Sequence, residues 1–90
     1  MANTQSAIRA MRENETKRLR NRMIRTRTRT FVKKARLAIG EAPAEAATEA
    51  ALRAAVSALD RAVTKGIMHR NAAARRKARL MRQLAKARAE

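Results

Sequence analysis

Cysteine, tryptophan and tyrosine are absent from this 90-residue chain, which also has a single histidine and a single phenylalanine. Without cysteine, a disulfide framework and a thiolate metal site are excluded, and one histidine is too few for a histidine-based metal cluster. Because proteins that bind single-stranded nucleic acid stack bases on several aromatic side chains, one aromatic ring also argues against that mode of binding. We therefore expect neither a cofactor nor a metal.

Long apolar runs, glycine and proline are scarce as well. No uninterrupted apolar stretch approaches the roughly 18 residues that a membrane-spanning helix needs, and the amino terminus lacks a signal-type hydrophobic segment. The two glycines, Gly40 and Gly66, and the one proline, Pro43, leave no glycine-rich loop for phosphate binding. The sequence thus predicts a soluble chain with no membrane partner.

Basic residues are what the chain has in abundance. Its 23 Lys and Arg against 7 Asp and Glu give a formal net charge of +16. Residues 1–36 hold 12 basic and 2 acidic side chains, residues 65–90 hold 9 and 1, and the segment between them is slightly acidic. Because two arms of like charge repel each other, this distribution predicts a polyanionic partner.

Arginine and threonine alternate from Arg25 to Thr30, as they would in a β-strand. A strand here would have no face to bury, whereas a helix, at about 100° per residue, separates a basic face from an apolar one. The basic face consists of Arg18, Arg22, Arg25, Arg29, Lys33 and Arg36. The apolar face consists of Ile24, Thr28, Phe31, Ala35 and Ala38, with Val32 and Ile39 at its margin. The segment is therefore predicted to be helical.

The first helix is expected over about residues 6–39, with Ser6 or Thr4 as its N-cap and Gly40 as its end. Its half from Arg9 to Arg22 is charged on every side. A helix that is polar all round gains little from packing. We therefore expect this half to project from the rest of the protein and to fray until a polyanion neutralises it.

Two further helices are expected, over about residues 43–65 and 71–88. Pro43 suits the first turn of the second helix, Gly66 with Ile67 suits a Schellman ending, and Asn71 suits the N-cap of the third helix. Their apolar lines are Leu52, Val56, Leu59 and Val63, then Ala73, Leu80, Leu84 and Ala87 with Met81. The third helix also carries a basic line of Arg75, Arg79, Arg82 and Lys86. Because the connections are short, the predicted fold class is all-α: one domain, residues 1–90, forming an antiparallel three-helix bundle with a long, overhanging first helix.

The remaining polar and sulfur-containing residues have ordinary structural explanations. His69 has no Asp, Cys or second His near it in the sequence, so a cap or a loop contact to RNA is expected of it and catalysis is not. The protein is predicted not to be an enzyme. Asp60 is expected to pair with Arg61 or Thr64, and Glu13 with Lys17, as on any helix surface. Ser6 and the threonines at 26, 28 and 30 could either donate to phosphate or bond their own backbone. Met11, Met23 and Met81 are expected to pack in the interior.

Two stretches resemble a known family. "SAIRAMRENETKRLRNRMIRTRTRTFVKKARLAI" and, after an alanine-rich helix, "DRAVTKGIMHRNAAARRKARL" are similar to the bacterial family of ribosomal protein twenty of the small subunit. The more specific part runs from Lys65 to Asn71 and on to Leu80. The resemblance implies a three-helix protein of the cytoplasmic small ribosomal subunit that binds 16S ribosomal RNA directly. It also implies contacts to the 5′ domain and 3′ minor domain, few or no protein contacts, and no small-molecule substrate.

On the matching positions, the resemblance implies seventeen RNA-binding residues. They are Ser6, Arg9, Arg12, Lys17, Arg18, Arg22, Arg25, Arg29, Thr30, Lys33 and Lys34 on the first helix, and His69, Arg70, Asn71, Arg75, Arg76 and Arg79 around the start of the third. The sequence departs from the usual family pattern at Arg27-Thr28 and at Ala78. A nucleoid-type DNA-binding protein is the alternative, supported by charge alone. A membrane-surface peptide is disfavoured because the apolar faces are poor in Trp, Phe and Leu.

Overall fold

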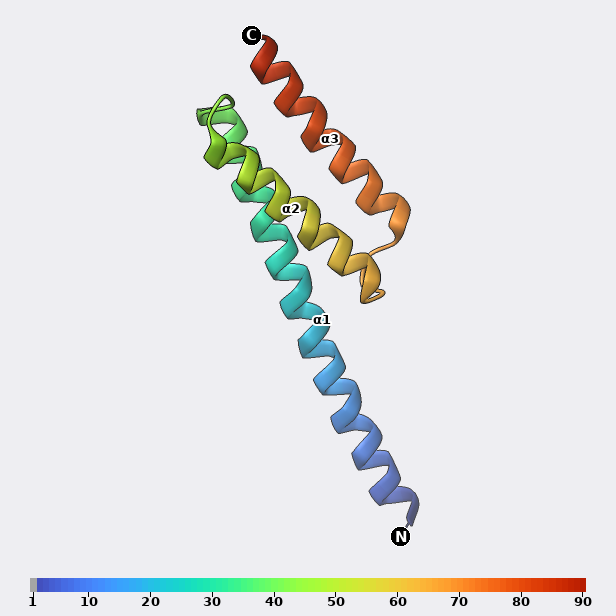
Figure 1. The fold of residues 1–90 in the computed structure, drawn as a ribbon. Coiled ribbons are helices and arrows are strands. Elements are labelled where there is room, and N and C mark those ends of the chain that lie inside the picture. The colour runs from blue at the N-terminus through green and yellow to red at the C-terminus, as the bar shows by residue number, and fades with distance from the viewer. Residues whose placement is uncertain (1) are drawn as a thin grey trace.

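The structure, a computed structural model, describes the backbone of residues 2–90 and the side chains of residues 4–90. Three helices make up the fold: α1, Ala2–Glu41; α2, Ala46–Thr64; and α3, Arg70–Ala89. The prediction of an all-α fold with three helices is confirmed. Figure 1 shows α2 lying beside the C-terminal half of α1, with α3 beside α2, while the N-terminal half of α1 extends beyond both. The molecule is accordingly elongated, at 68 × 21 × 13 Å.

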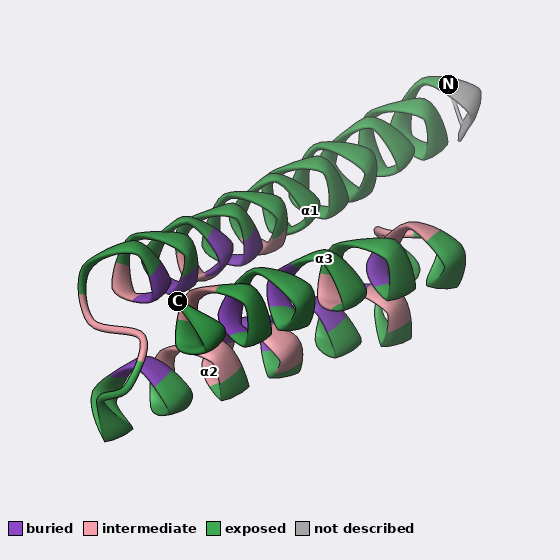
Figure 2. Cartoon of the chain, turned by 90° about the horizontal axis from the view of Figure 1, so that it is seen from above, coloured by how far each residue is buried: buried purple, intermediate pink, exposed green. Residues whose placement is uncertain are grey.

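The overhang of α1 is exposed on every side. Each residue from Thr4 to Met23 is exposed, including Met11 at 63% and Met23 at 71%. Figure 2 shows this part of α1 in the colour of exposed residues, whereas the buried segments of all three helices face one another. The predicted projection of this half is therefore confirmed, and the expected packing of Met11 and Met23 is wrong because no second helix reaches them.

The predicted fraying of this overhang in the absence of a polyanion stays a prediction. A helix polar on all sides is stabilised mainly by local pairs, each contributing only a few tenths of a kcal/mol. We expect circular dichroism at 222 nm to show an increase in helix content when RNA is added to the free protein. If the ellipticity of the protein at 222 nm stays constant after the RNA spectrum is subtracted, the overhang is already a stable helix.

The core lies where the three helices meet. Its buried members are Val32, Ala35 and Ile39 of α1, Ala55 and Leu59 of α2, and Ala73, Leu80 and Leu84 of α3. Every one of the α1 and α3 residues stands on a predicted apolar face. The fold therefore buries the side of α1 opposite to its basic face, which leaves the basic face in solvent.

The buried face of α2 differs from the prediction. Ala55, Ala58 and Ala62 are buried, whereas Leu52 and Val63 are only half-buried. Small side chains let two helix backbones approach closely, and Ala58 and Ala62 line hollows together with residues of α1. The larger residues lie at the side, where Leu52 and Val63 still pack against the core. Met81 of α3 is 51% exposed, and its expected place in the interior is wrong.

The connection between α1 and α2 is built differently from the prediction. Thr4 and Ser6 lie within α1, so neither is its N-cap, and Gly40 is also helical because α1 continues to Glu41. Pro43 lies in the turn before α2, not in its first helical turn, and the N-cap of α2 is Glu45. Residues 42–45 are needed to reverse the chain direction, which displaces the start of α2 toward the C-terminus.

Thr48 closes this connection. Its side chain is buried, at 1% exposure, and its hydroxyl donates to the carbonyl oxygen of Ala42 and, at 3.3 Å, to that of Ala38. The hydroxyl therefore satisfies carbonyl groups at the end of α1 from the first turn of α2. Sequence patterns did not single out Thr48, because its role depends on a contact between residues six and ten positions apart.

Replacing Thr48 with valine, which has the same shape, should lower the free energy of unfolding by about 1 kcal/mol, since the hydrogen bond of the Thr48 hydroxyl to the end of α1 is lost and the Ala38 and Ala42 carbonyls keep only their backbone donors. For a domain of this size the melting temperature should fall by roughly 4–8 °C. Thr64→Val is the matched control, because its hydroxyl bonds the Asp60 carbonyl at an exposed site. Thermal unfolding that shows equal effects for both variants would contradict the role assigned to Thr48.

Candidate nucleic-acid interface

The basic face of α1 is continuous and open to solvent. Arg18, Arg22, Arg25, Arg29, Lys33 and Arg36 are all exposed. Their spacing places them on one side of the helix, and the buried Ala35 and Ile39 hold the opposite side against α2 and α3. A helix rises about 1.5 Å per residue, so the six cations extend over roughly 27 Å. This surface matches an extended anion better than a compact one.

All seventeen predicted RNA-binding residues are exposed. The two ion pairs found among the described residues use other cations: Lys77 pairs with Asp60 at 2.7 Å, and Arg88 with Glu49 at 3.9 Å. The expected ion pair of Asp60 with Arg61 is therefore wrong, whereas the expected pairing of Asp60 with Thr64 is confirmed as a hydrogen bond from the Thr64 hydroxyl to the Asp60 carbonyl at 3.1 Å. Lys77 is preferred because it reaches Asp60 across the α2–α3 interface. The predicted contact residues are thus left accessible to an external anion.

The hydroxyl groups on α1 are less available than the guanidinium groups. Thr28 is 3% exposed and donates to the Ile24 carbonyl at 2.8 Å, so it faces the interior. Thr30 is exposed, but its hydroxyl donates to the Thr26 carbonyl at 2.9 Å. Of the two possibilities for these threonines, the structure has the bond to the helix backbone. Thr30 can still accept a hydrogen bond from a ribose hydroxyl.

The turn between α2 and α3 is fixed by its backbone. Gly66 has φ 74°, a conformation that glycine adopts without strain. The N–H of Ile67 donates to the Ala62 carbonyl and that of Gly66 to the Val63 carbonyl, both at 2.9 Å. These are the two bonds of a Schellman motif, so the predicted ending of α2 is confirmed.

His69 caps α3. Its Nδ1 accepts a hydrogen bond from the backbone N–H of Asn71 at 3.1 Å. The prediction that Asn71 is the N-cap is therefore wrong: α3 begins at Arg70, and Asn71 is the donor in this bond. Since Nδ1 accepts, the neutral ring carries its proton on Nε2, which leaves an N–H donor on the side facing away from the cap.

Replacing His69 with alanine should destabilise the protein by about 1 kcal/mol through loss of this cap. His69→Asn should retain most of the stability, because asparagine is a favourable N-cap, yet it removes the Nε2 donor. Thermal unfolding of the two variants measures the difference. If the alanine and asparagine variants melt together, the cap does not stabilise α3.

Two groups of predicted residues that are far apart in the sequence meet in one hollow. Arg25 and Arg29 of α1 line it together with His69 and Arg76 from the start of α3, and its volume is about 420 Å³. The other predicted residues are spread out: Ser6, Arg9, Arg12, Lys17 and Arg18 lie on the overhang of α1. Arg79 lies further along α3, where it shares a second hollow with Arg82 and Lys86.

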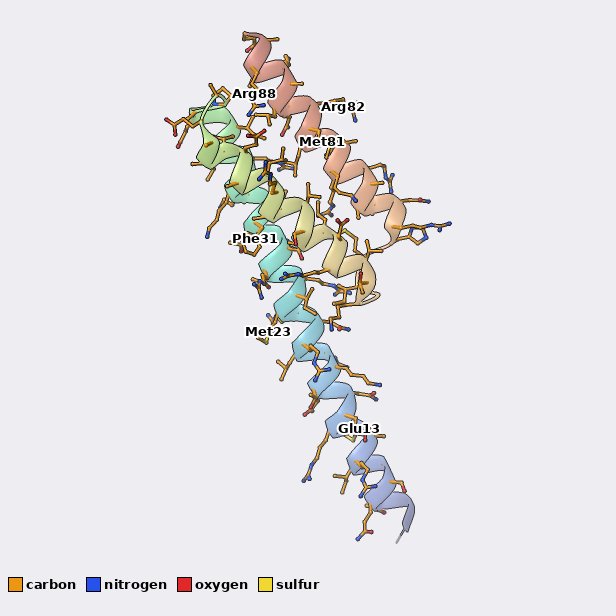
Figure 3. All side chains as sticks on the ribbon, in the orientation of Figure 1. Glu13, Met23, Phe31, Met81, Arg82 and Arg88 are labelled. Atoms are coloured by element: carbon orange, nitrogen blue, oxygen red, sulfur yellow. The ribbon has the colours of Figure 1, made fainter. Side chains whose placement is uncertain are left out.

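The structure also indicates cations that the predicted set leaves out. Arg82 and Lys86 belong to the basic line of α3, and Figure 3 shows Arg82 extending away from the bundle. Arg27 and Lys34 both lie over the Phe31 ring, at 5.7 and 5.9 Å from its centre. The spacing of four and three residues from Phe31 is the sequence signal for this arrangement. Arg27 also borders a groove between α1 and α2 with Arg61 and Lys65.

Acidic and histidine side chains are dispersed over the described part of the chain. No three His, Asp or Glu side chains there come close enough together to bind a metal ion. A search of the described helices for a stretch able to cross a membrane found none.

Comparison with known proteins agrees with this geometry. The model of the family "Ribosomal protein S20" matches residues 2–85. A protein of Thermomicrobium roseum is 52% identical over 92% of this chain and 83% of its own length, and one of Roseiflexus is 49% identical over 97% and 93%. A third, from Clostridium beijerinckii, is 44% identical over 93% and 95%, and all three are named small ribosomal subunit protein bS20. With a family match over nearly the whole length and relatives at this level of identity, the chain belongs to the ribosomal protein S20 family.

Proposed function

We propose that this protein is a structural constituent of the small ribosomal subunit, that it binds 16S ribosomal RNA directly in the cytoplasm, and that it has no catalytic activity. One observation carries the proposal: a continuous basic face on α1 and a basic turn before α3 lie exposed, in a chain of the S20 family. The names of its relatives place them in the small ribosomal subunit.

The chemistry of the exposed side chains favours the phosphate backbone of structured RNA. Arginine presents a planar fork of donors that binds phosphate through two hydrogen bonds. Recognition of double-stranded RNA uses mainly its shape, phosphates and 2′-hydroxyl groups, which needs no aromatic platform. A chain whose one aromatic ring is already flanked by Arg27 and Lys34 fits that mode of binding.

The shape of the molecule supports contacts to more than one RNA element. The overhang of α1 reaches beyond the bundle, while the α2–α3 turn carries a second set of cations (Figure 1). We propose that these two surfaces together contact the 5′ domain and the 3′ minor domain. We also propose few protein contacts, because the surface of α1 is dominated by like charge.

Sedimentation of a cell extract through a sucrose gradient tests the proposed function. The protein should travel with the small subunit at physiological salt. Its absence from that fraction would refute the proposal. Competition between folded 16S ribosomal RNA and duplex DNA at matched salt separates it from the nucleoid alternative, for which the two affinities would be equal.

A further inference from the structure

The hollow between α1 and the α2–α3 turn is lined by several basic residues. Three arginines, Arg25, Arg29 and Arg76, line it together with His69, and no acidic residue is among its lining residues. Neighbouring cations repel one another, and an anion bound between them replaces this repulsion by a net attraction. The convergence is costly for the free protein and favourable once a compact anion is present.

The floor of the hollow strengthens this effect. Ala62 is buried, and Ile67 and Met68 are half-buried, so apolar side chains line the hollow together with the charged residues. Apolar walls lower the local dielectric, which makes each contact between an anion and a guanidinium stronger than it would be on an open surface. The neighbouring Schellman turn at Gly66 fixes the backbone that carries His69, and the bond from Asn71 N–H to His69 Nδ1 holds the ring, so this one donor is in place before the anion arrives.

We propose that this hollow binds a single phosphate group of the RNA backbone, held at once from α1 by Arg25 and Arg29 and from α3 by Arg76, with His69 Nε2–H as a further donor. The proposal rests on the proposed function and assigns a particular phosphate-binding site to it. A compact tetrahedral anion fits because donors approach from several directions. The site ties α1 to the turn between α2 and α3, so binding of one phosphate would also hold the three helices together.

A double-mutant cycle with 16S ribosomal RNA tests whether two guanidiniums hold the same phosphate. Arg29→Gln, Arg76→Gln and the double variant are compared with the wild type by equilibrium binding. If Arg29 and Arg76 share a phosphate, the double variant should bind at least about threefold more tightly than the product of the single losses predicts. Arg36→Gln with Arg76→Gln is the matched control pair, because Arg36 is exposed on the same face of α1 but does not line the hollow.

The control pair should lose affinity additively. If the Arg29 and Arg76 pair is equally additive while RNA binding itself is strong, the shared site is refuted and the proposed function stands. If the wild-type protein binds ribosomal RNA no more tightly than duplex DNA, the proposed function fails. The hollow then has to be judged by its response to phosphate alone.

Inorganic phosphate provides that second measurement. His69 is the only histidine, so its ring signals in a ¹H–¹⁵N spectrum need no assignment. Added phosphate should shift the Nε2 signal of the wild type and of Arg36→Gln to a plateau, and should leave the Arg29→Gln/Arg76→Gln signal nearly unchanged. Circular dichroism checks that each variant is folded. Equal shifts in all three folded proteins would mean general ion screening and would overturn the assignment.

Discussion

Replacing Arg22, Arg25 and Arg29 with glutamate is expected to abolish binding to 16S ribosomal RNA while the helices of the bundle stay folded. Three charge-assisted contacts of roughly 1.5–3 kcal/mol each amount to at least about 4.5 kcal/mol, on the order of a thousandfold in affinity. Repulsion by the new carboxylates adds to that loss. All three arginines are exposed and none is in the core, so the fold should tolerate the change.

The control is a triple reversal with the same charge change elsewhere. Arg53, Arg61 and Arg88 are exposed, lie on α2 and α3 and are outside the predicted contact set. Their replacement by glutamate should weaken binding far less, since only the long-range field changes. Filter binding at fixed salt measures affinity, and circular dichroism measures helix content. Equal losses in the two triple variants would mean that net charge, and not the face of α1, governs binding.

A steep dependence of affinity on salt is the second large effect that we expect. If the protein neutralises ~6 to 10 phosphates, the logarithm of the binding constant should fall against the logarithm of salt concentration with a slope on the order of −5 to −9. Raising salt from about 50 to 200 mM would then cost roughly 10³–10⁵ in affinity. Binding isotherms at four or more salt concentrations give the slope directly.

The same experiment limits the size of the interface. A slope shallower than about −3 would leave at most a few phosphates in contact, too few for the exposed face of α1 and the α2–α3 turn together. The Arg22, Arg25 and Arg29 reversal supplies the internal comparison, because any residual binding should show a slope reduced by about 3.

The part of the fold that follows from local sequence was predictable. The helix over Arg25–Thr30 could be inferred because only that geometry gives both a basic and an apolar face, and α1 buries Val32, Ala35 and Ile39 as expected. The Schellman turn at Gly66 was predictable for the same reason, since the glycine and the following Ile67 carry the signal within a few residues.

Features that depend on contacts between helices were not predictable. The buried face of α2 combines the expected Leu59 with alanines, whereas hydrophobicity alone also favoured Leu52 and Val56. Met81 has the composition of a core residue but lies on the outer side of α3, at 51% exposure. In both cases the sequence indicates an apolar stripe, and only the neighbouring helix decides which edge of it is buried.

The candidate interface divides in the same way. The spacing of the arginines identified the face of α1, and family resemblance supplied the residues of the α2–α3 turn. Neither could show that Arg25 and Arg29 line the same hollow as Arg76, because the residues are more than forty positions apart and meet only after the chain has turned twice. For His69 the sequence left a cap and a loop contact to RNA open, and only the structure shows that it caps α3 in place of Asn71, the commoner N-cap residue.

The most direct test of the account is the position of the Arg25 and Arg29 guanidinium groups in an experimental structure of the protein bound to 16S ribosomal RNA. We predict that their nitrogen atoms lie within hydrogen-bond distance, roughly 2.7–3.0 Å, of phosphate oxygens, with residues 25–30 helical. Guanidinium groups that face solvent with no phosphate in reach, or an extended backbone over these residues, would contradict it.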